Sequence, residues 1–160
     1  MKKLLGIIIL GLLLSGNAYA DADNNLRGIK EFQLLVDHNG CNKDNFSKEI
    51  TTNTKYLISN SKIKLSDIAK ETLYLSIFSN SGEESGTPMC ASYIKLEVYS
   101  FGMVENSVGQ ERFHTRISYK KSALAWHIGS DHMDRHRDAI SRNFDQWIKE
   151  FIIDWSEAQN

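Results

Sequence analysis

Alternation of apolar and polar residues, the pattern of a half-buried strand, recurs along much of the chain. The alternating stretches are 28–37, 72–80, 91–101 and 111–120, and a shorter extended piece covers 63–65. Leu124, Trp126 and Ile128 either continue the last stretch or form one more short strand. The serine- and glycine-containing segment 79–88, which holds the only proline, is typical of a loop. The pattern predicts a sheet of four or five strands.

Each predicted strand has one aliphatic face and one more polar or aromatic face. The aliphatic positions are Phe32, Leu34, Val36, Leu73, Leu75, Ile77, Ile94, Leu96 and Val98. The other face carries Tyr74, Phe78, Tyr93, Tyr99 and Phe101. Within 111–120, the alternation places Ile117 and Tyr119 on the same face. We expect the aliphatic face to be the buried one.

Near the C-terminal end, apolar residues recur at steps of three, four and seven, which is the stripe of an amphipathic helix. They are Met133, Ile140, Phe144, Trp147, Ile148, Phe151, Ile152 and Trp155. Ser130 or Asp131 is in position to cap this helix. An earlier helix is predicted from an N-cap at Ser47 to about Asn60.

The order strand, helix, three or four strands, helix predicts a two-layer α+β sandwich. Two helices would cover one face of a mixed or mainly antiparallel sheet of four to five strands. If the first crossover is right-handed and parallel, Cys41, which follows the first strand, and Cys90, which begins the third, lie at the same edge. We therefore expect a Cys41–Cys90 disulfide. Two separate thiols and an intermolecular bridge are the alternatives.

Several short segments resemble those of small, uncharacterised exported bacterial proteins with the same strand–helix–strands–helix plan. The segments are Ser47-Lys48-Glu49-Ile50, Leu57 followed by Ile63, Leu73-Tyr74-Leu75, Trp126-His127-Ile128-Gly129, and Phe151-Ile152-Ile153-Asp154-Trp155 with the Asn160 end. They are spread over most of the chain beyond residue 20. The resemblance implies a fold and no reaction.

The first 20 residues have the pattern of a signal peptide. Two lysines open it, an apolar run follows to Leu14, and Ala18-Tyr19-Ala20 offers small residues at the positions that signal peptidase reads. We expect cleavage after Ala20 and a single exported domain, 21–160, in the periplasm or outside the cell. The apolar run is shorter than the ~20 residues of a membrane-spanning helix, and no later stretch is apolar enough to span a bilayer.

Composition narrows the classes of function without naming one. The chain of 160 residues is 41% hydrophobic and 24% charged, as in an ordinary globular domain. Beyond Ala20 it holds 17 basic and 20 acidic residues, a net charge of −3. A nucleic-acid partner is therefore not expected.

A histidine cluster marks the start of the last predicted helix. His132 and His136 lie four residues apart, so both rings could face one way and ligate zinc or copper, with Asp131, His127 or His114 completing the site. Met133 stands where an H-E-x-x-H motif would have its glutamate. The alternative interpretation is a solvated polar helix start, with acidic residues at the positive end of the helix dipole.

The sequence contains no nucleotide-binding glycine loop, no G-x-S-x-G elbow and no C-x-x-C motif. We therefore expect a non-enzymatic binding or accessory module of the cell envelope. Its partner, a protein or a second copy, would contact the aromatic sheet face at Tyr93, Tyr99 and Phe101. Ordinary cross-strand pairing of these aromatic residues is the alternative interpretation of that face. A metal-binding periplasmic protein that uses His132 and His136 is the second hypothesis for function, and a small hydrolase without a recognisable motif is the third.

Overall fold

The computed structural model describes residues 26–41, 45–105, 111–129 and 132–160, so the predicted signal peptide lies outside the described residues. The elements are β1 (Glu31–Asn39), α3 (Phe46–Ser59), β2 (Lys64–Leu65), β3 (Glu71–Glu84), β4 (Thr87–Glu105), β5 (Glu111–Ile128) and α4 (His132–Ala158). Their order and their α+β class confirm the predicted fold. No helix in the described ranges is both long and apolar enough to cross a membrane.

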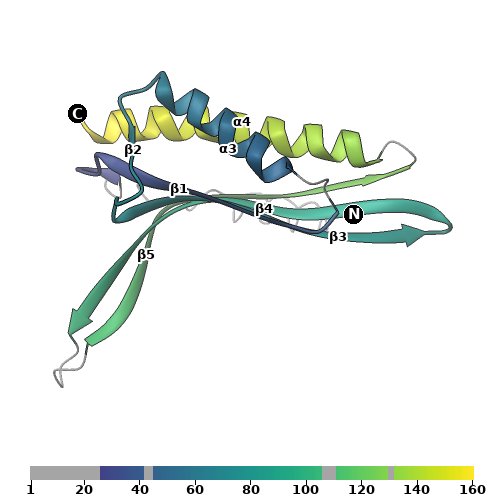
Figure 1. Ribbon diagram of the computed structural model, residues 1–160, viewed down its shortest axis with the longest axis horizontal. Helices are drawn as coiled ribbons and strands as arrows, with labels where there is room; N and C mark the ends of the chain where they lie inside the picture. Colours follow the sequence, from purple (N-terminus) through teal and green to yellow (C-terminus); the bar gives the residue numbers. More distant parts are fainter. Residues whose placement is uncertain (1–25, 42–44, 106–110, 130–131) are drawn as a thin grey trace, which may run out of the picture.

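The five strands form one mixed sheet in the order β2-β1-β3-β4-β5. β1 is parallel to β2 and β3, because α3 carries the chain back to the same end of the sheet before β3 begins. β3, β4 and β5 are antiparallel neighbours. Both helices lie on the same side of the sheet, with α3 packed against β1 and α4 against β4 and β5 (Figure 1).

The hydrophobic core lies between the helices and the covered sheet face. Its largest fully buried side chains are Phe32, Phe46, Phe144, Phe151, Leu26, Ile50, Ile58, Leu73, Leu75, Ile77, Ile94 and Leu96. The predicted aliphatic face of the central strands is therefore the covered one. Each such side chain contributes roughly 1.5–3 kcal/mol by leaving water.

Two parts of the chain that were predicted as loops or separate pieces are continuous strands. β3 runs to Glu84 and β4 begins at Thr87, so most of segment 79–88 is a hairpin rather than a loop. The turn is only Ser85-Gly86, both with positive φ (52° and 80°), which suits the right-handed twist of paired strands. At the same end of the sheet, beside the start of β4, 124–128 continues β5 and does not form a further strand.

A β-bulge in β5 corrects one predicted face. Val98 pairs with Tyr119 and Tyr99 pairs with Ile117, so Ser118 is an extra residue with no partner across the strand. The side chain of Tyr119 is consequently buried at 6% exposure, whereas Ile117 is 51% exposed on the opposite face. Strict alternation had placed both on one face.

The first helix also starts differently from its prediction. Its N-cap is Asn45 in a left-handed conformation, without a side-chain hydrogen bond, and Ser47 lies inside the first turn. Phe46 is buried against the core at the first helical position. We infer that burial of this ring, rather than a hydroxyl cap, fixes where the helix begins.

A glycine allows the end of β1 to approach β3 closely. Gly40 has a φ of 97°, and a Cβ atom at this position would clash with the backbone carbonyl oxygen of Ser79. Glycine alone avoids both the strain of a positive φ and the clash with the Ser79 carbonyl. The close approach brings the Cα atoms of Cys41 and Cys90 to 6.2 Å, and the predicted disulfide between them is present.

We predict that Gly40→Ala lowers the free energy of unfolding and impairs formation of the disulfide. Gly28→Ala is a matched control, because Gly28 also has a positive φ (78°) but open space around its Cα. Both variants carry a backbone penalty of ~1–2 kcal/mol, and the Gly40 variant adds a clash with backbone. Urea unfolding and thiol titration measure the two effects. If both variants lost the same free energy of unfolding, the close approach of Gly40 to Ser79 would be contradicted.

Candidate functional site

The sheet face opposite the helices carries a row of large exposed side chains. Phe78, Tyr93 and Leu124 are direct neighbours across β3, β4 and β5. Their exposed fractions are 42%, 38% and 78%, and Trp126, two residues further along β5, is 66% exposed. Both helices of the described residues lie on the other side of the sheet (Figure 1). We refer to these four residues as the apolar row.

A hollow of about 450 Å³ lies on the same face, further along the strands. It is lined by Leu35, Val36, Asp37, Tyr74, Glu97, Tyr99 and Ile117. The Tyr74 and Tyr99 rings meet edge to face with their centroids 5.7 Å apart, and the Tyr74 hydroxyl donates to Asp37 Oδ2 at 3.1 Å. The hollow is thus an aromatic surface with a carboxylate at its rim.

The charges between the hollow and the apolar row are paired. Glu97 is nearly buried, and its carboxylate lies 3.2 Å from Lys95 Nζ and 3.6 Å from Lys120 Nζ. Lys95 also lies over the Phe78 ring, 5.9 Å from its centroid. Burial raises the pKa of both Tyr74 and Tyr99, so both hydroxyls stay neutral. In this part of the face, two lysines (Lys95 and Lys120) and two carboxylates (Glu97 and Asp37) therefore balance in charge.

The predicted contact residues fall partly on this surface. Tyr93 belongs to the apolar row and Tyr99 lines the hollow, whereas the side chain of Phe101 lies outside the described residues. The sequence interpretation missed Leu124 and Trp126 as surface residues. Their alternation with the small residues Ala123 and Ala125, which face the helices, was the available signal. Partner binding by these residues stays a prediction.

The covered face carries a second cluster of chemically distinctive residues at one end of the core. Ser79 Oγ lies 2.5 Å from Ser92 Oγ, and Ser92 Oγ lies 2.6 Å from His136 Nε2. His136 Nδ1 is in turn 3.1 Å from Nδ1 of His127, which pairs with Cys90 across β4 and β5. These four residues and the Cys41–Cys90 disulfide form what we call the buried polar cluster.

The buried polar cluster changes the interpretation of the predicted histidine site. His136 is completely buried, so a solvated helix start does not describe it. The sequence did not reveal this burial, because a histidine next to aspartates resembles a surface residue. The spacing of His136 from the apolar positions of α4 was the signal that it faces the core. The side chain of His132 lies outside the described residues. Binding of zinc or copper by His132 and His136 together stays a prediction.

A third histidine lies next to the cluster on the covered face. His38 Nε2 is buried and makes no hydrogen bond with the described residues, and its ring meets Phe46 edge to face with centroids 5.8 Å apart. Burial lowers the pKa of His38 below its ordinary value of 6.5, with a smaller opposing effect from the charge of Asp37. The neutral imidazole is therefore the form that fits the folded protein.

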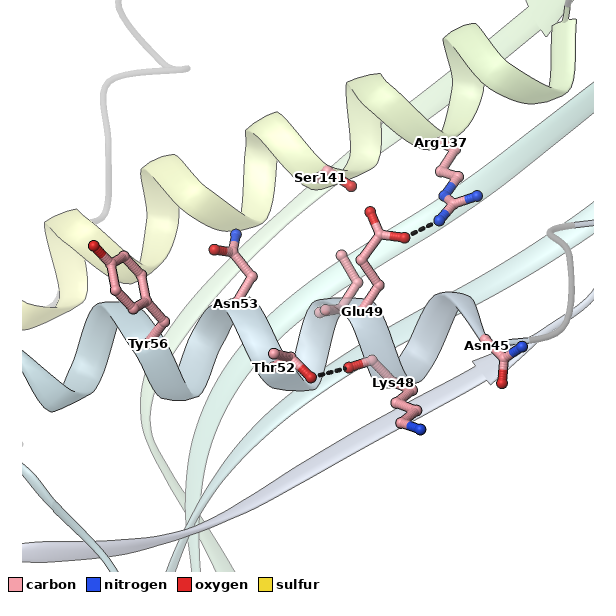
Figure 2. A pocket seen from close by; sticks show the side chains of 9 residues that line it. Asn45, Lys48, Glu49, Thr52, Asn53, Tyr56, Arg137 and Ser141 are labelled. Carbon is pink, nitrogen blue, oxygen red and sulfur yellow. Dashed lines mark hydrogen bonds and ion pairs between the residues drawn. The ribbon is translucent and has the colours of Figure 1, made fainter.

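A groove of about 790 Å³ runs along the outer surface between α3 and α4. Glu49 of α3 forms an ion pair with Arg137 of α4 across it (Figure 2). The Arg137 guanidinium also lies over the Phe46 ring, 5.4 Å from its centroid, and Asn53 donates a hydrogen bond to Asp145. These contacts join the helices to each other, so we interpret the groove as a packing seam.

No protein-family model matches the sequence, and no curated protein matches it. A hypothetical protein from Chlamydia trachomatis superposes with a TM-score of 0.45 at 9% identity, over 77% of this chain and 97% of its own. A DUF330 protein from Xanthomonas campestris gives 0.44 at 9%, over 81% and 88%. Rare lipoprotein B from Shewanella oneidensis gives 0.37 at 12%, over 74% and 89%.

These similar structures are bacterial, and they include a lipoprotein and proteins without an assigned function. At such identities and TM-scores, they assign no activity, ligand or partner to this chain.

We predict that the partly buried His38 makes stability fall in mild acid. Below pH 6.5 the unfolded chain takes up a proton at this residue while the folded chain resists it, so the free energy of unfolding decreases until the folded-state pKa is reached. The His38→Gln variant should lose less stability than the wild type between pH 7.5 and pH 5.5, roughly one unit to either side of the ordinary histidine pKa. Urea unfolding at both pH values measures the difference. If the wild type and His38→Gln lost the same stability between the two pH values, the neutral state assigned to the His38 imidazole would be contradicted.

Proposed function

We propose that the protein is an exported, non-enzymatic module of the cell envelope that assembles through the uncovered face of its sheet. The apolar row is the observation that carries this proposal. Four large side chains exposed side by side on one sheet face form a patch of the kind that marks interaction sites. Tyrosine, tryptophan and phenylalanine are also the residues that interfaces favour.

The location in the envelope is supported by two features of the chain. The first 20 residues have the pattern of a signal peptide. The Cys41–Cys90 disulfide suits an oxidising compartment such as the periplasm or the cell exterior. Both features favour export.

The occupant that suits the apolar row best is a second copy of the chain. A twofold interface brings the same surface of two molecules together, so any net charge on that surface would repel itself. The Lys95–Glu97–Lys120 group and Asp37 balance each other, so the described residues beside the apolar row carry no net charge that would oppose a second copy. Burying Leu124 and Trp126 in each copy would contribute roughly 1.5–3 kcal/mol per side chain.

The hairpin of β4 and β5 adds to the support for assembly. Its far end bends away from both helices (Figure 1), so this part of the hairpin extends beyond the layer that covers the rest of the sheet. A projecting two-stranded ribbon is marginally stable alone in water. A second copy on the uncovered face would lie beside it.

We predict concentration-dependent dimerisation of the purified protein, which the double substitution Leu124→Ser and Trp126→Ser abolishes. Analytical ultracentrifugation measures the dissociation constant. Tyr56→Ser is the control, because Tyr56 is 66% exposed on the helical side, as exposed as Trp126. The control should leave the constant unchanged.

Three results would count against this proposal. A wild type that stays monomeric at high concentration would contradict the second copy as the occupant of the apolar row. A dimer that survives the double substitution would place the interface elsewhere. A dimer that Tyr56→Ser weakens to the same extent would assign it to the helical side.

A further inference from the structure

The buried polar cluster holds three metal-binding groups within reach of one another. A ring nitrogen of His136 and the Sγ atoms of Cys41 and Cys90 all lie within 4.8 Å of one another. In a tetrahedral zinc site with ordinary bond lengths, the ligand atoms are separated by roughly 3.3–3.8 Å. Small side-chain movements would therefore bring the three atoms around one ion.

His127 lies beside His136 and supplies a candidate fourth group. Its Nδ1 lies 3.1 Å from Nδ1 of His136, close to the spacing of two imidazole ligands on one metal ion. It pairs with Cys90 across β4 and β5, so the sheet register places these two residues side by side. Two sulfurs and two imidazoles are a common ligand set for structural zinc.

We propose that the Cys41–Cys90 disulfide and a zinc ion are alternative links at this position: when the disulfide is reduced, Cys41, Cys90, His127 and His136 bind one Zn²⁺. A disulfide sulfur is a poor ligand, since zinc is bound by the thiolate form of cysteine. The oxidised cluster is therefore closed to zinc, and reduction opens it. This site differs from the predicted His132–His136 pair and is independent of the apolar row.

Reduction of the Cys41–Cys90 disulfide needs a dithiol reductant, which supplies the two electrons. A thiolate of the reductant attacks Cys41 Sγ, because Cys41 is partly exposed whereas Cys90 is completely buried. The S–S bond breaks, a mixed disulfide forms at Cys41, and Cys90 leaves as the thiolate. The second thiol of the reductant then displaces Cys41, so two electrons pass to the protein and the reductant becomes a disulfide.

Zinc binding follows by exchange for protons. The two cysteines release one proton each as Zn²⁺ binds, and the two imidazoles bind in their neutral form. The two thiolates balance the charge of the ion, which suits a buried site. The end of β1 therefore stays joined to β4 under reducing conditions, through the metal in place of the disulfide.

The test compares zinc binding by the oxidised and the reduced protein. A phosphine reductant cleaves the disulfide, and zinc that stays bound after gel filtration is measured by mass spectrometry. We expect one equivalent in the reduced protein and none in the oxidised one. Cobalt(II) in place of zinc should give the thiolate charge-transfer band and the visible bands of a tetrahedral site.

Substitutions identify the ligands. His127→Ala and His136→Ala should each lower the zinc affinity of the reduced protein by more than the ~10–100-fold that changes outside the ligand shell cause. His38→Gln is the matched control, because His38 is another histidine on the covered face and lies outside the cluster. It should leave the affinity unchanged.

Clear outcomes would overturn the proposal. One is the absence of stoichiometric zinc from the reduced protein. Another is a zinc affinity that neither His127→Ala nor His136→Ala changes, because a site of the copper type, with two sulfurs alone, would not need the histidines. If reduction unfolds the chain, zinc should restore the near-ultraviolet circular dichroism. Failure to restore it would equally contradict the site.

Discussion

The structure depends on one constraint, which is that both helices cover the same face of the sheet. Because side chains alternate along a strand, this arrangement divides β3 and β4 into positions in the core beneath the helices and positions that face water. Leu75 and Leu96 are completely buried, while Phe78 and Tyr93 are exposed on the same pair of strands. The hydrophobic core and the uncovered face therefore both result from the placement of α3 and α4 on one side of the sheet.

The covered face changes its chemistry from one end to the other. Along β3 and β4 the paired positions pass from leucine and valine through isoleucine to Ser79–Ser92 and then to Cys90. Buried polar groups are costly unless hydrogen bonds satisfy them. Here Ser79, Ser92 and His136 bond one another in a chain, next to a disulfide. Gly40 makes this possible, because only glycine allows the end of β1 to lie so close to β3.

Periodicity predicted the order of the elements and the two layers, because strand alternation and a helical stripe are local properties of a sequence. The disulfide followed from the parallel crossover expected for that order. Periodicity could not predict the bulge at Ser118, which reverses the faces of Ile117 and Tyr119 and depends on pairing with β4. Nor could it predict that His136 turns inward to Ser92, a contact between residues 44 positions apart. The hairpin at Ser85-Gly86 was missed because polar residues concealed its long strands.

Quenching of tryptophan fluorescence by acrylamide tests the one-sided layering most directly. The chain has three tryptophans, of which Trp126 is exposed on the uncovered face, while Trp147 and Trp155 of α4 are only 9% and 6% exposed. In dilute protein, one accessible component should appear, and Trp126→Phe should remove it. At high concentration, that component should become protected as two uncovered faces meet. Protection of Trp126 in dilute protein, or ready quenching of Trp147 and Trp155, would contradict the layering.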